Sequence, residues 1–265
     1  MAGRTMLKEF SEMLRFSREF QDKEHARNIQ TEVCEAFCVI MSDNPEGIDL
    51  AINKSDSDIV GELMKLVHDD IPLEEIETIH VSALKSLCAF GKPEHRHQLY
   101  ERGIQESIIQ NMKSDKPNVT LFTAATLYKL ISGEWYLNGF KCLHPFFDTF
   151  EEQGINKILF EDGLKRGNCQ KTIDLSAECL SLLYQQRELP IEMKEVVINQ
   201  LTKGLQNPDK ADIKCSSRGL LSLAQSENET SNAVQRSCTS SLYCEVDVDQ
   251  SSNVFSSSAA SEQRV

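Results

Sequence analysis

Several features that mark common protein classes are missing from this sequence. It has no run of 18 consecutive apolar residues, so no membrane span is predicted. Residues 1–16 lack the apolar core and the cleavage site of a secretory leader. Positive charge is also scarce, because 28 Lys and Arg stand against 41 Asp and Glu. The net charge of −13 argues against binding to nucleic-acid phosphates or to an anionic membrane surface. We therefore expect a cytoplasmic protein, or alternatively a nuclear one, with neither of these partners.

The motifs of the common enzyme classes are missing as well. No P-loop, dinucleotide-binding glycine pattern or metalloprotease helix motif occurs. Cys34 and Cys38 stand four apart, as in the first half of a zinc site, but no second ligand pair follows at a suitable spacing. A cysteine enzyme would need a positioned base and an oxyanion site, which the pattern does not supply. We expect no metal, no cofactor and no catalytic residue, and we interpret most of the nine cysteines as reduced, buried thiols.

Helical periodicity fills most of the chain. Apolar residues recur at helical spacing from residue 6 to residue 225, and no alternating strand pattern precedes residue 226. Prolines separate the periodic segments, and we expect one helix to start at Pro72 and another to cover residues 117–131. Pro145 should split the following segment, 133–150, into two short helices. The sequence predicts an all-α protein.

The helices also repeat. Five of them share an apolar pair three residues apart, and successive pairs are offset by 47, 43, 53 and 40 residues. These offsets are close to the 40–47 residues of two-helix and three-helix solenoid repeats. The pairs are Phe37/Ile40, Leu84/Leu87, Leu127/Leu130, Leu180/Leu183 and Leu220/Leu223.

The repeating segments resemble armadillo repeats. SALKSLCAF (82–90), TAATLYKLI (123–131), SAECLSLLY (176–184) and SRGLLSLAQ (217–225) are similar to the third helix of such a repeat. Residues 95–115 and 151–167 look like the preceding two helices, with Gly103 and Gly154 in matching places. The resemblance covers about four degenerate units in residues 24–225. Residues 1–23 would form a capping helix, and the Ser-rich, polar residues 226–265 a disordered tail.

The resemblance implies a fold and a kind of function. Armadillo-like proteins are right-handed α-solenoids (superhelices) whose third helices line a groove for extended peptides or partner domains, and they are generally not enzymes. We therefore expect a non-enzymatic scaffold or adaptor, and more narrowly a co-chaperone or assembly factor. The alternatives are a HEAT-like regulatory subunit of an enzyme complex and, less favoured, a cysteine-dependent helical enzyme. The partner would be a protein or an extended peptide; no oligomeric state is predicted.

Two groups of residues are candidates for partner binding. The long offset of 53 places an insertion at 133–150, where aromatic residues either pack an extra helix or form an exposed anchor. The only tryptophan of the chain falls beyond the predicted third helix. Importin-like armadillo proteins differ in this respect, because ladders of Trp and Asn hold their basic peptide. Cations near the third helices form the second group and suit an acidic peptide. The candidates are Trp135, Tyr136, Phe140, Phe146 and Phe147 in the insertion, and the cations Lys85, Lys129 and Arg218.

Overall fold

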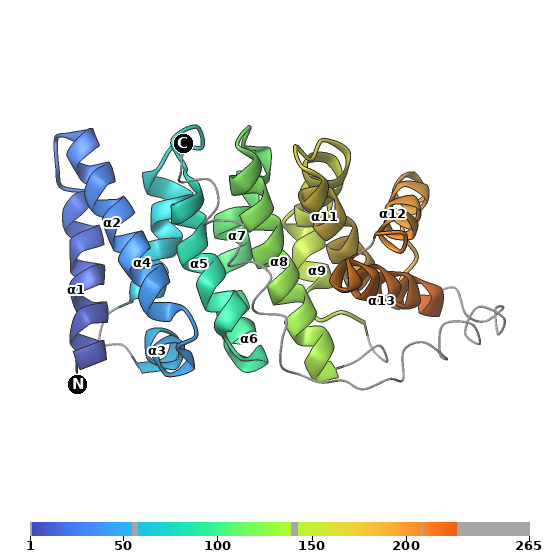
Figure 1. Cartoon of the computed structure of the whole chain (residues 1–265), viewed down its shortest axis with the longest axis horizontal. Coiled ribbons are helices and arrows are strands. Elements are labelled where there is room, and N and C mark those ends of the chain that lie inside the picture. Colours follow the sequence, from blue (N-terminus) through green and yellow to red (C-terminus); the bar gives the residue numbers. More distant parts are fainter. Residues whose placement is uncertain (1, 55–57, 139–142, 208, 227–265) are drawn as a thin grey trace.

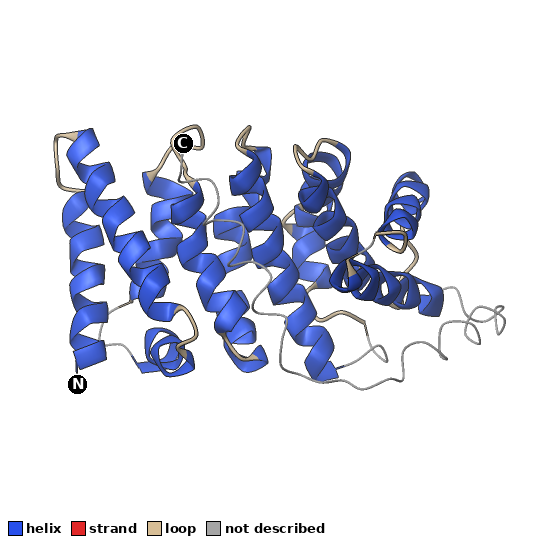
Figure 2. Ribbon diagram, viewed as in Figure 1, coloured by secondary structure: helices blue, strands red, loops and turns tan. Residues whose placement is uncertain are grey.

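The computed structural model describes residues 2–54, 58–138, 143–207 and 209–226. Within these ranges the chain is helical and has no strand (Figure 2). Its α-helices are α1 (Ala2–Ser17), α2 (Lys23–Met41), α3 (Pro45–Asp49), α4 (Ile59–Lys65), α5 (Thr78–Phe90), α6 (Pro93–Glu101), α7 (Ile104–Ile108), α8 (Pro117–Asn138), α9 (Phe147–Glu152), α10 (Ile155–Ile158), α11 (Gln170–Leu183), α12 (Ile191–Gly204) and α13 (Lys210–Ser226). Four π or 3₁₀ segments continue short helices: η1 (Leu50–Lys54), η2 (Leu66–Asp70), η3 (Ile109–Lys113) and η5 (Leu159–Lys165).

The helices form stacked units of three. A first helix (α3 with η1, α6, α9) leads to a second (α4 with η2, α7 with η3, α10 with η5) and then to a longer third (α5, α8, α11). The third helices pack on one another in the order α2, α5, α8 and α11, and α13 packs on α11 (Figure 1). The second helices form a parallel layer, in which α4 contacts α7 and η3 contacts η5. The predicted all-α solenoid is confirmed, with α1 and α13 at its two ends (Figure 1).

The repeated apolar pairs hold the units together. Leu84, Leu87, Leu127 and Leu130 are fully buried, and they belong to one continuous core that runs through all the units. Burying a leucine side chain contributes about 2 kcal/mol, so the repeated pairs are a substantial part of the stabilisation. At the ends of the stack, where one neighbour is missing, the pair is less completely covered, as at Ile40. The sequence period therefore predicts the core correctly.

Two glycines connect first helices to second helices. Gly103 and Gly154 have φ angles of +83° and +69°. This left-handed conformation is unfavourable for residues with a Cβ atom, which is why glycine occupies both matching places. The junction predicted from the sequence is thus confirmed in two units.

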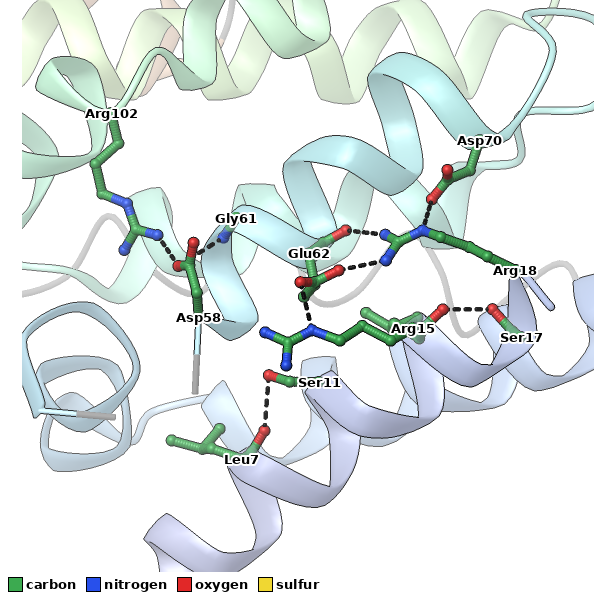
Figure 3. A network of polar contacts seen from close by, with 11 residues as sticks. Leu7, Ser11, Arg15, Ser17, Arg18, Asp58, Gly61, Glu62, Asp70 and Arg102 are labelled. Atoms are coloured by element: carbon green, nitrogen blue, oxygen red, sulfur yellow. Dashed lines mark hydrogen bonds and ion pairs between the residues drawn. The ribbon is translucent and has the colours of Figure 1, made fainter. Parts of the chain in front are cut away.

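An ion-pair network holds α1 against α4 (Figure 3). Arg15 Nε lies 2.7 Å from Glu62 Oε1, and Arg18 pairs with both Glu62 and Asp70. Glu62 is buried; although burial opposes it, hydrogen bonds from the two arginines hold its pKa below the ordinary value. Removing one member would leave a buried charge without its partner, which is destabilising. The network therefore fixes the position of the first helix against the solenoid.

Two helix boundaries differ from those expected. Helix α5 begins at Thr78 rather than at Pro72, because Ile71 and Ile76 are buried and hold the intervening residues in a turn. Helix α8 does not end at residue 131 but continues through Gly133 to Asn138. A single glycine costs a helix about 1 kcal/mol, which is too little to end one that is packed on both sides.

The domain boundaries drawn from composition stay predictions. The described chain ends with α13 at Ser226, so residues 227–265 of the predicted tail lie outside the described residues.

Candidate peptide-binding face

The third helices present one surface along the stack, formed by α2, α5, α8, α11 and α13; we call it the third-helix face. Four cations lie within electrostatic range of one another around Lys129 of α8, the others being Lys85 on α5, Arg96 on α6 and Arg218 on α13. Lys85, Arg96 and Lys129 are half-buried, and Arg218 is buried. The sequence placed three of these residues near third helices, and the structure brings all three together.

Lys85 is held over an aromatic ring of the next unit. Its Nζ lies 4.0 Å from the centre of the Phe122 ring on α8. Such a cation–π contact stabilises a partly desolvated ammonium by about 1 kcal/mol. Burial lowers the pKa of Lys85, which the nearby Cys38 thiol partly opposes. The Lys85 side chain is therefore held in one position before any partner binds.

Lys129 lies where the cations converge. Burial is the main cause of its lowered pKa, followed by the positive charge of Arg96; Cys215 opposes the shift, and Arg218 and Lys85 add to it. Each of the three other cations thus acts electrostatically on Lys129. A group of like charges at a partly desolvated surface is unfavourable by itself and is relieved when an anion binds.

Arg218 is fixed by the neighbouring third helix. Its Nη1 donates a hydrogen bond of 3.2 Å to the Tyr128 hydroxyl oxygen on α8. The same hydroxyl lies 3.2 Å from the Cys215 sulfur on α13. Tyr128 therefore ties α13 to α8 and sets the direction of the guanidinium group.

Arg96 was not predicted, because it belongs to a first helix and not to the repeated third-helix pattern. Its Nε donates a hydrogen bond of 2.7 Å to the carbonyl oxygen of Cys88 at the end of α5. A Cβ atom at Gly133 would lie 2.9 Å from the Arg96 Cδ, so the glycine makes room for the side chain on α8. Gly133 was instead expected at the start of the next segment, so the sequence offered no signal for this contact.

Two acidic residues on α11 and α13 beside these cations are either protonated or paired with another side chain. Glu178 on α11 is 3% exposed, and burial raises its pKa to about 8, so its carboxyl is mostly protonated at pH 7. Asp212 pairs with Lys171 and also accepts a hydrogen bond from the Asn207 amide at 2.8 Å. Glu178 and Asp212 therefore add little negative charge beside the four cations, in a chain whose net charge is −13.

Two of the aromatic residues in the insertion are packed inside. Phe146 and Phe147 are 1% and 6% exposed. Phe146 stacks on Tyr100 of α6 at a centroid distance of 3.4 Å, and Phe147 meets Tyr184 edge-on at 4.9 Å. The rings join the first helices α6 and α9 and close the core beside α11. An exposed anchor is therefore wrong for these two residues, because the first-helix layer needs their apolar surface.

The structure describes the other three aromatic candidates only in part. Trp135 and Tyr136 belong to α8, so the expectation that the tryptophan falls beyond the third helix is wrong. Their side chains, like the whole of Phe140, lie outside the described part of the structure.

Two cysteines on the described helices are held as protonated thiols by burial. All six cysteines within the described ranges are free thiols. Burial raises the pKa of Cys38 to about 11 and that of Cys88 to about 12, so both stay protonated at neutral pH. In the described residues no three His, Cys, Asp or Glu side chains are grouped so as to hold a metal ion. No helix there is long and apolar enough to span a bilayer.

Comparison with known proteins identifies the fold. A designed armadillo repeat protein is 17% identical, with a TM-score of 0.58 over 83% of this chain and 84% of its own. The fold is that of an armadillo-repeat solenoid. A second designed armadillo repeat protein, in complex with the peptide (KR)4, is 16% identical with a TM-score of 0.55, over 88% of this chain and 98% of its own. A third belongs to computationally designed armadillo repeat proteins for modular peptide recognition (16% identity, TM-score 0.54, 82% of this chain and 91% of its own). Neither a protein-family model nor a curated protein matches the sequence of this armadillo solenoid.

Proposed function

We propose that this protein is a non-enzymatic scaffold that holds an acidic, extended segment of a partner protein across the third-helix face. The observation that carries the proposal is the convergence of Lys85, Arg96 and Arg218 on Lys129. They come from four different helices, so the charge is built by the stacking of units and not by one local cluster.

The similar structures support the general role. Two of them are designed armadillo repeat proteins described with a bound peptide or for peptide recognition. The peptide (KR)4 in one complex alternates lysine and arginine and is therefore basic. The cations on the face of the present protein favour the opposite charge in its partner, because complementary charge sets specificity and association rate.

Two further observations favour a scaffold over an enzyme. The cysteines with shifted pKa values are shifted upward by burial, which opposes thiolate chemistry. Burial lowers the pKa of Lys85, whose ammonium group lies over the Phe122 ring, an arrangement that suits the binding of a partner's anion. The narrower roles, a co-chaperone or assembly factor and a regulatory subunit of an enzyme complex, would use the same face and differ in the partner that it holds.

The test is a binding titration with defined peptides. Fluorescein-labelled (ES)5 should bind the full chain, measured by fluorescence anisotropy, and labelled (KS)5 should not. The double variant K85Q/K129Q should weaken (ES)5 binding about tenfold, since it removes two of four cations from the face. Circular dichroism at the same temperature checks that the variant is folded.

A matched pair of lysines provides the control. Lys8 on α1 and Lys157 on α10 are exposed and lie on helices that are not part of the third-helix face. The variant K8Q/K157Q carries the same change in net charge and should bind (ES)5 as the wild type does. Equal losses in the two double variants would show that net charge, and not the third-helix face, governs binding, and would refute the proposal.

A further inference from the structure

The chain itself carries an acidic segment that suits the third-helix face. Residues 227–265 contain six carboxylates and two arginines. Three of the carboxylates, Glu245, Asp247 and Asp249, alternate with Val246 and Val248. In an extended backbone, alternate side chains project to the same side and are about 7 Å apart. Such a segment would offer three carboxylates on one side.

The basic face offers a comparable set of cations. Lys85, Lys129 and Arg218 come from α5, α8 and α13; α5 packs on α8, and α11 lies between α8 and α13, so the positive charge is spread across the stack rather than along one helix. Each of these side chains is held by burial or by a contact with its neighbours. A bound segment that runs across the third helices would contact these cations one after another. An extended chain of a few residues is long enough to do so, whereas a helix of the same number of residues is less than half as long.

The tail starts close to this face. Arg218 lies eight residues before Ser226, the last residue of α13, which is about 12 Å along the helix. Nineteen further residues lead from Ser226 to Glu245, and a flexible chain of this length spans on average about 25 Å. The acidic segment can therefore return to the face without any rearrangement of the solenoid.

We propose that residues 245–249 occupy the third-helix face in the absence of a partner, so that the tail competes with partner binding. This inference rests on the proposed function, because it assigns the same face to an internal ligand. A tethered segment acts at an effective concentration on the order of 1 mM, so even a weak intrinsic contact competes measurably.

The experiment compares three full-length chains in the (ES)5 titration. The variant E245Q/D247N/D249N removes the proposed internal ligand and should bind (ES)5 on the order of tenfold more tightly than the wild type. The variant E227Q/E229Q/E262Q removes the same number of charges from the same tail and should bind as the wild type does. Both sets of substitutions fall after Ser226, beyond the residues that the structure describes, and circular dichroism checks that each variant is folded.

Each outcome decides one of the two claims. If all three chains bind (ES)5 equally, the tail does not occupy the face, while the proposed function stands. If the control variant gains as much as the first variant, general tail charge and not residues 245–249 is responsible, and the inference is wrong. If none of the chains binds (ES)5, both claims fall.

A second measurement detects the contact itself. A water-soluble carbodiimide joins an ammonium group and a carboxylate that touch, and mass spectrometry of the digested monomer identifies the pair. We expect Lys85 or Lys129 to be joined to the peptide that contains Glu245, and this product to be absent from E245Q/D247N/D249N. Products that join the tail only to lysines of the second-helix layer would contradict the inference.

Discussion

His144 lies between α8 and α9 and uses both ring nitrogens. Its Nε2 lies 3.1 Å from the carbonyl oxygen of Ile131, and its Nδ1 accepts a hydrogen bond of 3.2 Å from the Phe146 amide. The neutral ring with a proton on Nε2 satisfies both contacts. Burial lowers the pKa of His144 to about 4, although the bond to Ile131 opposes the shift.

This histidine should make the protein sensitive to acid. Its folded pKa lies below the unfolded value of about 6.5, so the unfolded chain binds the proton more readily between these two values. Its contribution is complete above pH 6.5 and is lost as the pH falls towards 4, by on the order of 3 kcal/mol. H144Q should be less stable at pH 7 but should lose less stability between pH 6.5 and 4 in urea unfolding. A slope equal to that of the wild type would contradict this assignment.

Glu178 should have the opposite dependence. Burial raises its pKa to about 8, above the unfolded value of about 4.5. The unfolded chain therefore releases this proton first, and the folded state loses stability as the pH rises from 4.5 to 8. E178Q removes this effect, so it should match the wild type near pH 4 and exceed it at pH 9 by on the order of 5 kcal/mol. Urea unfolding at the two pH values measures the difference; a difference that does not change with pH would contradict it.

At the scale of single residues, the sequence predicts which cations lie near third helices but not how they meet. Lys85, Lys129 and Arg218 follow from the repeat period. Arg96 does not, because it reaches the face from a first helix through the space at Gly133. The burial of Glu178 is also not visible in the sequence, where it resembles any acid on a helix surface.

Among the elements, α9 and its aromatic residues connect two units. Phe146, which directly precedes α9, is buried against Tyr100 of α6, and its ring centre lies 6.1 Å from that of Phe150 on α9. F146A removes a large buried ring and should cost about 3–5 kcal/mol in the free energy of unfolding. Its effect on (ES)5 binding should be small under conditions where the variant is folded. Lost binding with unchanged stability would instead support the anchor interpretation.

The junction glycines permit a cleaner test of local structure. A Cβ atom at Gly154 would have no neighbour within 4 Å, so G154A should act through the backbone alone. The left-handed conformation makes alanine less favourable by about 1–2 kcal/mol, and thermal unfolding should show the loss. Asparagine tolerates this conformation better, so G154N should lose less. Equal effects of the two substitutions would argue against the backbone as the cause.

The elements also show where sequence periodicity stops being informative. The pattern locates the third helices to within a few residues, because their apolar pairs face a core on both sides. It fails at residues 133–138, where α8 continues past Gly133, which lies beside Arg96 of α6, and at residues 72–77, where buried isoleucines favour a turn. Neither outcome can be predicted from local apolar spacing alone.

The whole molecule is a stack in which each unit covers the apolar side of the next. A recurrence at nearly constant spacing was sufficient to predict this architecture, since single motifs of two leucines are common in any buried helix. The charge of the third-helix face was predicted only in part. It depends on the protonation of Glu178 and on the pairing of Asp212 with Lys171, both of which require the folded structure.

The central claim is that binding occurs across the third helices, and hydrogen–deuterium exchange of the full chain with saturating (ES)5 tests it most directly. Slower exchange should appear in α5, α8 and α13, which carry Lys85, Lys129 and Arg218. The second-helix layer, α4, α7 and α10, should exchange as it does without the peptide. Protection confined to that layer, or spread evenly over all helices, would contradict the account.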